Sequence, residues 1–581
     1  MKIKHLNINL LFFLFIIFFQ PFSSQAYNYP KNYFRSPVDF KITLSATFAE
    51  LRNNHFHSGI DIRTFTSGKK VYAVADGVVS RIKISAGGYG KALYIDHPNG
   101  YTSVYAHLSK FAPQIESFIK SQQYQQKSFE IDIDFNKLKS HKKEQFKLKK
   151  GDIIAYSGNS GSSMGPHLHF EVRETKSEEP INPMHLGFKI ADTKAPKIYN
   201  LYIYPLDKNS SVNGKNSRQT FKVSELNNNH YILKTNNINL HGKIGFAIHT
   251  QDFLDNTWGQ CGINKLQLKI NDSLITNYTF DKFSFDESSY INSHMDYELS
   301  QTDNHKVHKA FIEPNNKLNF YSKMKSDGSY EFNDDKSYKI EFAVYDSYQN
   351  KAKLQFKAVG DTTSVSFPEK EFTSSFKYQN ENHFSRPDIE IKFPKNCFYS
   401  DLNFDYSTSR DSNFFSAIHH IHKSTVALNK HYSMSIKVDH FNQKLSDKLL
   451  IVQIDKDGKL SSEGGIYVDG FVKTKTRNLG DFAVSIDTIA PTVTTKTDYK
   501  NKNISKLKFI DFTIKDELSG IKSYQGEIDN KWVLFEFDKK NDRLFYTFDK
   551  KRLVKNKKHH LKLLVNDAVG NFSLYECDFT W

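Results

Sequence analysis

Histidine and aspartate occur in this sequence at spacings that could hold a metal ion. His57 and Asp61 lie close together, and Gly59 between them lets the connecting backbone turn tightly. A second pair, His167 and His169, follows further along the chain. Zinc binds imidazole nitrogen and carboxylate oxygen, and a catalytic site uses three protein ligands and leaves one position for water. His57, Asp61 and one histidine of the second pair would supply this set. The sequence therefore indicates a hydrolytic site, in which the metal ion lowers the pKa of its bound water from ~15.7 toward ~7.

The second pair lies in a run that reads as a β-strand with one polar and one apolar face, because side chains alternate along a strand. The polar face would carry four residues, His167, His169, Glu171 and Arg173. The opposite face would carry three apolar residues, Leu168, Phe170 and Val172. The polar face of this strand is therefore predicted to line an active site. The alternation does not decide which of the two histidines binds the metal.

Another strand with a polar face is predicted over residues 101–108, where Tyr101, Ser103, Tyr105 and His107 share one side. A single histidine on such a strand is more often incidental than catalytic, so the importance of His107 depends on the other histidines. With three ligands assigned, His107 and the remaining histidine of the second pair are left to transfer protons and to stabilise an oxyanion. The charge of the metal should hold both rings neutral.

The elements that must position these residues are short strands. Strands are predicted over residues 70–75, 77–84, 92–96, 102–108 and 149–156, with turns at Asp76-Gly77 and Pro98-Asn99-Gly100 between them. This regular succession of short strands and turns predicts a compact antiparallel β domain that ends near Phe188. Residues 112–147 are rich in Gln, Lys, Ser and Asp, and we expect them to form an inserted loop or hairpin outside the core.

Three motifs in this order resemble the lysostaphin/LytM-type zinc metalloendopeptidases that cut peptidoglycan peptides. They are His-x-Gly-x-Asp, Tyr-Ala-His-Leu, and Gly-Asn-Ser-Gly-Ser-Ser-Met-Gly-Pro-His-Leu-His-Phe-Glu-Val-Arg. The resemblance covers about residues 45–188. It implies that His57, Asp61 and His169 are the zinc ligands and that His107 and His167 are the catalytic pair.

Three further residues near the motifs have weaker claims. His55 is a rival for the first ligand position, but it lacks the glycine and aspartate at the matching offsets. Glu171 and Arg173 would support the ligands or line the substrate groove, and a solvated strand end explains them about equally well. The 112–147 insertion departs from the family pattern and should flank the groove, where it would affect specificity rather than chemistry.

The N-terminus reads as an export signal. Lys2 and Lys4 give a positive start, residues 10–19 are an apolar run, and Ser24-Gln25-Ala26 is a small-residue cleavage site. An uncleaved membrane anchor is the alternative, but the run is shorter than the ~20 residues that a span needs. We therefore expect residues 1–26 to be removed and the protein to act in the periplasm or cell envelope, or to be secreted. No later segment is apolar enough to cross a bilayer.

Composition narrows the class of protein and of partner. Tyr and Phe dominate the aromatic residues, which favours strands over helices. The formal charge of +16 comes from scattered lysines without a nucleic-acid motif, so an anionic wall polymer is a better partner than nucleic acid, although solubility alone would also explain it. Cys261, Cys397 and Cys577 lie far apart, and we expect buried free thiols rather than disulfides.

The remaining two-thirds of the chain repeats the phrase Asp-Thr-x-Ala-Pro at residues 192–196 and 487–491. Each copy is followed by alternating strands, as at the start of bacterial immunoglobulin-like sandwiches. Asp346 and Asp567 mark the matching ends; they could bind calcium, but a turn-capping role is the better interpretation. The chain is thus predicted to be all-β in five parts. These are a signal peptide (1–26), a metallopeptidase domain (27–190), an Ig-like β-sandwich (191–360), a less certain β domain (361–486) and a second Ig-like β-sandwich (487–581).

Two functions fit this organisation. The first is an exported zinc metalloendopeptidase that hydrolyses amide bonds in peptidoglycan stem or cross-link peptides, with C-terminal β domains that contact the wall or an envelope protein. The second is a catalytically inactive envelope protein that binds the wall or activates another hydrolase. Zinc content and peptide-bond cleavage would separate them.

Overall fold

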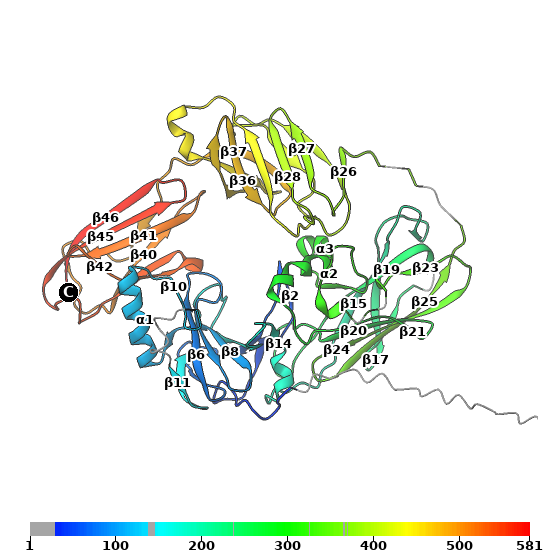
Figure 1. Ribbon diagram of the computed structural model, residues 1–581, viewed down its shortest axis with the longest axis horizontal. Coiled ribbons are helices and arrows are strands. Elements are labelled where there is room, and N and C mark those ends of the chain that lie inside the picture. Colours follow the sequence, from blue (N-terminus) through cyan, green and yellow to red (C-terminus); the bar gives the residue numbers. More distant parts are fainter. Residues whose placement is uncertain are drawn as a thin grey trace, which may run out of the picture.

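The chain folds into four β-rich units that follow one another around a ring (Figure 1). The computed structural model describes residues 29–137, 146–235, 238–322, 324, 326–363, 367–368 and 370–581. The predicted signal peptide, residues 1–26, lies outside them. Strands far outnumber helices, which confirms the all-β prediction. Within the described part of the chain, no helix combines the length and the apolar character needed to span a bilayer.

The N-terminal unit is built on one antiparallel sheet whose central strands carry the predicted site. Its strand order is β1-β4-β13-β8-β7-β6-β10. The bounds are β1 (Leu44–Ala46), β4 (Ile60–Arg63), β13 (His167–Glu174), β8 (Tyr101–Leu108), β7 (Lys91–Asp96), β6 (Gly77–Ile84) and β10 (Ile131–Asp134). The apolar face predicted for residues 167–173 is confirmed, since Leu168, Phe170 and Val172 are fully buried in the core.

Smaller elements complete this unit. A second sheet has the order β5-β12-β9, and a hairpin of β2 and β3 precedes β4. Two short strands extend the main sheet, with β14 on β13 and β11 on β6. The bounds are β2 (Leu51–Arg52), β3 (His55–Phe56), β5 (Lys70–Tyr72), β9 (Lys110–Phe111), β11 (Lys147–Leu148), β12 (Ile153–Tyr156) and β14 (Pro180–Ile181).

The prediction of a loop or hairpin outside the core for residues 112–147 was wrong. Residues 113–126 form helix α1 (Pro113–Gln126), which starts with proline at its first turn and buries Ile115 and Ile119, one helical turn apart. Strand β10 then pairs with β6 and buries its alternate isoleucines, Ile131 and Ile133. Most of the Gln, Lys and Asp residues lie on the other faces of these elements, but Gln123 is buried, and its Nε2 donates to Phe129 O at 2.7 Å. Residues 138–145 of this segment lie outside the described residues.

The second unit is one connected sheet of eleven strands in which β19 pairs with both β15 and β25. Its main strands are β15 (Lys197–Pro205), β17 (Gln219–Asn227), β18 (His230–Leu233), β19 (Asn239–Gln251), β20 (Lys265–Ile270), β21 (Ser273–Thr279), β24 (Ser337–Tyr345) and β25 (Lys351–Gly360). The short strands are β16 (Ser211–Val212), β22 (Val307–Lys309) and β23 (Tyr330–Phe332), and two short helices are α2 (Ile291–His294) and α3 (Tyr297–Thr302). The Ig-like character of this unit stays a prediction.

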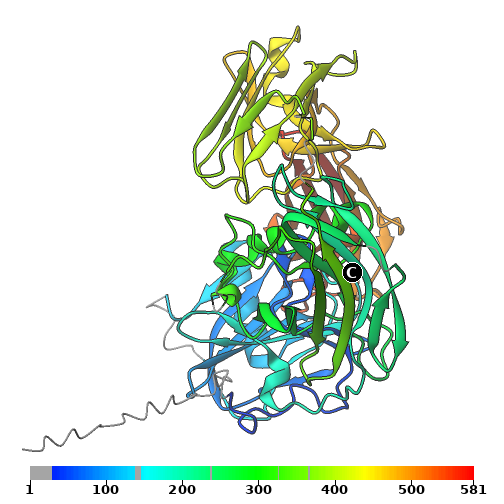
Figure 2. The same ribbon diagram turned by 90° about the vertical axis from the view of Figure 1, so that its right-hand side faces the viewer.

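The third unit has two five-stranded sheets, and in Figure 2 it lies at the top, above the N-terminal and second units. The first sheet contains β27 (Asn382–Arg386), β28 (Ile389–Phe393), β32 (Tyr432–Lys437), β36 (Phe471–Thr476) and β35 (Ile466–Val468). The other contains β30 (Tyr406–Ser409), β31 (Ile418–Ile421), β37 (Gly480–Ile486), β33 (Leu449–Ile454) and β34 (Leu460–Gly464). A separate short pair joins β26 (Ser374–Phe376) to β29 (Leu402–Phe404).

The C-terminal unit has a four-stranded and a five-stranded sheet around one core. The smaller contains β38 (Thr492–Thr494), β40 (Phe509–Lys515), β44 (Arg543–Thr547) and β43 (Phe535–Asp538). The larger contains β39 (Lys502–Asn503), β46 (Phe572–Thr580), β45 (Lys558–Asp567), β41 (Ile521–Ile528) and β42 (Lys531–Trp532). As predicted, Cys261, Cys397 and Cys577 are buried free thiols.

The ring is closed because the C-terminal unit packs back onto the N-terminal unit beside helix α1 (Figure 1). Lys91 Nζ lies 2.7 Å from Glu536 Oε2. The rings of Tyr124 and Trp532 meet edge-on with centroids 5.1 Å apart, and Leu534 is buried in the core cluster of the N-terminal unit. The N-terminal and C-terminal units are therefore held together by both apolar and charged contacts.

Candidate metal centre

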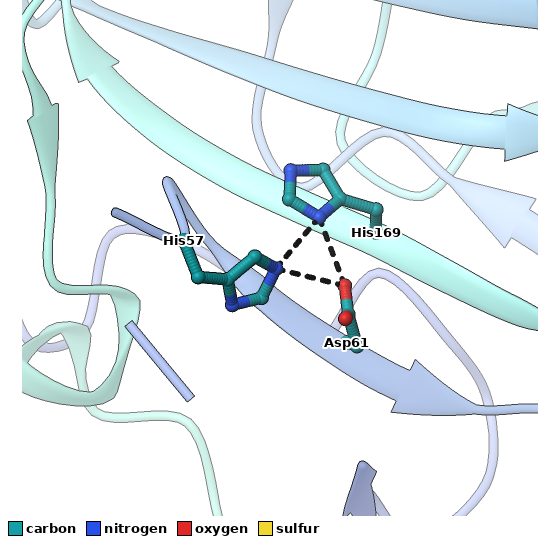
Figure 3. Close-up of side chains that lie close together, drawn as sticks. All are labelled: His57, Asp61 and His169. Carbon is teal, nitrogen blue, oxygen red and sulfur yellow. Dashed lines mark hydrogen bonds and ion pairs between the residues drawn. The ribbon is translucent and has the colours of Figure 1, made fainter. Parts of the chain in front are cut away.

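Three of the predicted residues meet where β4, β13 and the turn before β4 come together (Figure 3). Asp61 on β4 lies directly opposite His169 on β13 in the antiparallel register. Asp61 Oδ1 is 2.8 Å from His169 Nδ1 and 3.1 Å from His57 Nε2. The two imidazole nitrogens are themselves 3.1 Å apart. One donor atom of each residue thus points at a common position.

Each histidine of this group is oriented through its other ring nitrogen. His57 Nδ1 lies 2.7 Å from the backbone oxygen of Thr47, and His169 Nε2 lies 2.8 Å from Glu171 Oε1. Carbonyl and carboxylate partners of this kind fix the tautomer and ring orientation of metal-binding histidines. Two imidazole nitrogens and one carboxylate oxygen, all buried, form a donor set that fits zinc.

The carboxylate of Asp61 stays charged in this pocket. Burial on its own would raise its pKa, but the nearby imidazoles of His57, His167 and His169 hold the pKa well below the ordinary value. Arg52 adds positive charge on the other side, since its Nη2 lies 3.6 Å from Asp61 Oδ2. An anionic carboxylate is the form that can coordinate a metal ion.

His107 and His167 lie next to this group, with ring centroids 4.7 Å apart. His167 Nε2 is 3.4 Å from Asp61 Oδ1, and the ring of His107 is 5.8 Å from that of His169. Burial, together with the neighbouring histidines, lowers the pKa of His107 to about 3, so its ring is neutral. The structure therefore brings all five predicted residues into one site.

A buried carboxylate, Glu171, supports the site from behind. Its Oε1 accepts hydrogen bonds from His169, from Ser58 Oγ at 2.5 Å and from the hydroxyl of Tyr89, while its Oε2 lies 2.6 Å from Arg173 Nε. Burial would raise the pKa of Glu171, but Arg173 and His169 outweigh it and hold the pKa far below the ordinary value. Glu171 is thus a permanent anion that accepts from the ring of His169.

The match to known families covers the same part of the chain. Residues 55–124 and 134–183 match peptidase family M23. The N-terminal unit is a peptidase family M23 domain. The family resemblance predicted from the three motifs is therefore confirmed. Residues 373–487, most of the third unit, match the Zu5-like domain.

Three relatives share the M23 region. DD-carboxypeptidase/endopeptidase Mpg of Neisseria meningitidis is 32% identical over 142 residues, which is 24% of this chain and 25% of that protein. Peptidoglycan DD-endopeptidase ShyA of Vibrio cholerae is 30% identical over 171 residues, covering 28% of this chain and 32% of ShyA. Murein hydrolase activator NlpD of Salmonella dublin is 29% identical over 160 residues, covering 27% of this chain and 33% of NlpD. The chain thus spans between a quarter and a third of these relatives.

The rival ligand His55 does not join the M23 site. It is exposed at the start of β3, and its Nδ1 lies 2.9 Å from the backbone oxygen of Asn53. The sequence did not indicate Thr47, which contacts His57 through its backbone oxygen alone, or Ser58, whose hydroxyl donates to Glu171, 113 residues further along the chain. Tyr89 could have been found, because it lies between two glycines, Gly88 and Gly90.

Gly59 is needed in the M23 domain because of crowding rather than an unusual backbone angle. A Cβ atom at this position would lie 2.3 Å from Phe170 O and 2.9 Å from Glu171 Cγ, both on the strand that carries His169. We expect Gly59→Ala to push β4 and β13 apart, to cost about 1–3 kcal/mol of stability and to weaken zinc binding. Thermal unfolding and zinc titration measure both effects. Gly165→Ala is the matched control, since its Cβ would meet no atom within 4 Å; equal effects of the two variants would contradict the explanation.

Removing the charge of Glu171 should weaken the metal centre without touching a ligand. In Glu171→Gln the acceptor of His169 is lost or reoriented, which we expect to lower zinc affinity about 10–100-fold. Arg173 would be left without its anion in a buried place, at a cost of about 3–5 kcal/mol. Competition with a zinc chelator and thermal unfolding are the measurements. Glu178→Gln, an exposed carboxylate beyond the same strand, should change neither, and an unaltered zinc affinity in Glu171→Gln would remove its supporting role.

Proposed function

We propose that this chain is an exported zinc metalloendopeptidase that hydrolyses amide bonds in the stem or cross-link peptides of peptidoglycan. The observation that supports this most is the convergence of His57, Asp61 and His169 on one position, with His107 and His167 beside it. The names of the relatives Mpg and ShyA support a DD-endopeptidase reaction, and that of ShyA supports the substrate.

In the proposed site His57, Asp61 and His169 would hold Zn²⁺, which supplies Lewis-acid activation of water and of the scissile carbonyl. The two other histidines have their tautomers set by the backbone. His107 Nδ1 lies 2.9 Å from Ser160 O, and His167 Nδ1 lies 2.9 Å from Gly165 O. Because a carbonyl oxygen only accepts, both Nδ1 atoms carry the hydrogen, and Nε2 is an acceptor in either ring whenever that ring is uncharged.

This arrangement suits proton transfer during hydrolysis. One ring can take a proton at Nε2 from the attacking water, which is the role of a general base. As an imidazolium it can then donate to the oxyanion, or return the proton to the leaving amine. The neutral state of His107 in the folded protein is the state that a base requires.

The rest of the proposal concerns location and partners. Residues 1–26 would direct export to the periplasm or cell envelope, and the charge of +16 suits an anionic wall polymer. We propose domains at 27–190, 191–360, 361–486 and 487–581, of which 191–360 and 487–581 are Ig-like sandwiches. These β domains would position the M23 domain or bind an envelope protein.

A second candidate is a wall-binding protein without catalysis that activates another hydrolase. The relative NlpD, named as a murein hydrolase activator, favours it. The five site residues favour the enzyme, because a scaffold has no need of three converging donor atoms with two further histidines beside them.

One experiment tests both candidates. Residues 27–581 are purified, the bound zinc is measured by mass spectrometry, and the protein is incubated with isolated peptidoglycan whose peptides are then analysed. We expect one zinc per chain and newly freed peptide termini. A protein that binds no zinc and cuts no peptide bond, but increases the activity of an added wall hydrolase, would establish the second candidate instead.

A further inference from the structure

A second group of potential metal ligands lies outside the M23 site, at the start of the second unit. Asp192 is in the connection between the M23 domain and β15, Asp252 directly follows β19, and Asp346 directly follows β24. One oxygen of each carboxylate lies within 4.8 Å of the other two. Asp252 and Asp346 are only 2% and 1% exposed. Three distant parts of the chain therefore bring three carboxyl groups to one buried position.

Two oxygens of this group have no hydrogen-bond partner. They are Asp252 Oδ1 and Asp192 Oδ2, and both are buried. A buried carboxylate oxygen without a partner is costly unless a cation or a proton neutralises it. Burial raises the pKa values of Asp192 and Asp252 to about 8, and repulsion adds to this effect, from Asp252 and then Asp346 on Asp192 and from Asp346 on Asp252. The nearby Lys194 does not fill the gap, since its ammonium donates to Leu254 O at 3.1 Å.

Asp346 differs from its two neighbours because it is satisfied by its own turn. Its Oδ1 accepts from the backbone N–H groups of Tyr348 and Asn350, each at 2.8 Å, and its Oδ2 accepts from Asn350 Nδ2 at 2.6 Å. The turn-capping role predicted from the sequence thus describes Asp346. It leaves the unpartnered oxygen of Asp252 without an explanation, whereas the carboxyl groups of Asp192 and Asp346 can share a proton.

The C-terminal unit contains an equivalent group that serves as an internal comparison. Asp487, Asp516 and Asp567 also bring their oxygens within 4.8 Å of one another. Here, however, the residue that corresponds to Asp252 has partners: Asp516 Oδ1 accepts from the backbone of Leu518 at 3.1 Å and of Gly520 at 2.6 Å. The chain after Asp252 offers its Oδ1 no such donor. The unsatisfied oxygen is therefore specific to the group in the second unit.

We propose that Asp192, Asp252 and Asp346 bind a divalent cation with the chemistry of Ca²⁺. The ligands are all hard oxygen atoms, which Ca²⁺ prefers, and the group contains no imidazole to favour zinc. Cys261 lies near, but burial and the surrounding carboxylates raise its pKa, so the thiol stays neutral. Mg²⁺ fits less well because it keeps several waters of its own, whereas two of the three carboxylates are almost fully buried.

A cation in this position would stabilise the junction between the second unit and the M23 domain. Asp252 and Cys261 exchange backbone hydrogen bonds of 2.8 and 2.9 Å, and the next residue, Gly262, donates to Thr47 Oγ1 at 3.0 Å. Leu254 and Cys261 are part of the M23 core cluster. The segment that the cation would fix at Asp252 thus packs against Thr47, and the backbone oxygen of Thr47 faces His57. The proposal concerns binding and stability, and it holds whether or not the M23 site is active.

The test is a Ca²⁺ titration of the purified chain 27–581, freed of metal and then saturated with Zn²⁺ so that the M23 site is occupied. Calorimetry should show Ca²⁺ binding with a component lost in Asp252→Asn, whose affinity at that site falls more than about tenfold. Excess Ca²⁺ should raise the unfolding temperature of the parent by about 5 °C, and Mg²⁺ by less. Asp516→Asn, the matched change in the C-terminal unit, should keep this component.

Several results would overturn the proposal. They are the absence of Ca²⁺ binding to the parent, equal binding by Asp252→Asn, or loss in Asp516→Asn alone. A parent whose unfolding temperature ignores Ca²⁺ would show that protons, not a cation, neutralise the group. Asp252→Asn should be at least as stable as the parent without Ca²⁺, since a repelling carboxylate is gone.

If Asp252→Asn does not fold, Tb³⁺ luminescence of the parent protein decides the question. Tb³⁺ bound at the site is excited through tyrosine, because Tyr348 adjoins the site. Emission that Ca²⁺ cannot displace would refute the site. His169→Ala should bind Ca²⁺ as the parent does.

Discussion

His169→Ala and Asp61→Ala are expected to lose zinc and peptidoglycan cleavage together. Each removes one of three donor atoms that meet within about a hydrogen-bond length of one another, and two ligands cannot form the site that a zinc hydrolase needs. We expect the zinc content to fall well below one per chain and cleavage to fall by at least about a thousandfold. Metal analysis of the purified variants and peptide analysis of digested peptidoglycan give the two numbers.

The matched control is His55→Ala. His55 is a histidine two residues before His57, it is exposed, and its Nδ1 lies 2.9 Å from the backbone oxygen of Asn53. It should keep both zinc and cleavage. Cleavage that persists unchanged in His169→Ala or Asp61→Ala would show that the metal assignment is wrong. Loss of zinc in His55→Ala would point to a different first ligand.

The second large effect should separate metal binding from proton transfer. His107→Asn and His167→Ala are expected to retain one zinc per chain while cleavage falls about 10²–10⁴-fold, the usual contribution of a positioned acid or base. Asparagine is the better replacement for His107, because this residue has a left-handed backbone (φ 57°) that asparagine tolerates.

The combination of readouts makes this prediction specific. The zinc content, the unfolding temperature and the rate of cleavage are measured on the same preparations. A variant that loses zinc as well as cleavage would move its histidine into the ligand set. A variant that keeps full cleavage would remove its histidine from the mechanism.

The local pattern was sufficient to predict the central strands and the polar face that carries the candidate site. In β13 the alternation of histidine, glutamate and arginine with Leu168, Phe170 and Val172 separates the apolar face from the polar face without any knowledge of the fold. The pairing of Asp61 with His169 needed the family resemblance, because register depends on two strands that are far apart in sequence.

What the sequence did not reveal depends on contacts between distant residues. Helix α1 has few apolar side chains, and Ile115 and Ile119 become a buried face only where the sheet covers them. The support that Ser58 and Tyr89 give to Glu171 joins residues separated by a large part of the domain. In the second unit, β25 pairs in parallel with both β18 and β19, a closure that no local pattern specifies.

The docking of the C-terminal unit on helix α1 has a consequence for biosynthesis. Lys91 and Tyr124 are synthesised well before their partners Glu536 and Trp532, and Glu536 follows Lys91 by 445 residues. Domains generally fold in order as they emerge, so the M23 domain must complete most of its fold with this surface still uncovered. Until the C-terminal unit has been made and has folded, the surface around Tyr124 is uncovered, and it is closed only when Trp532 packs against that ring.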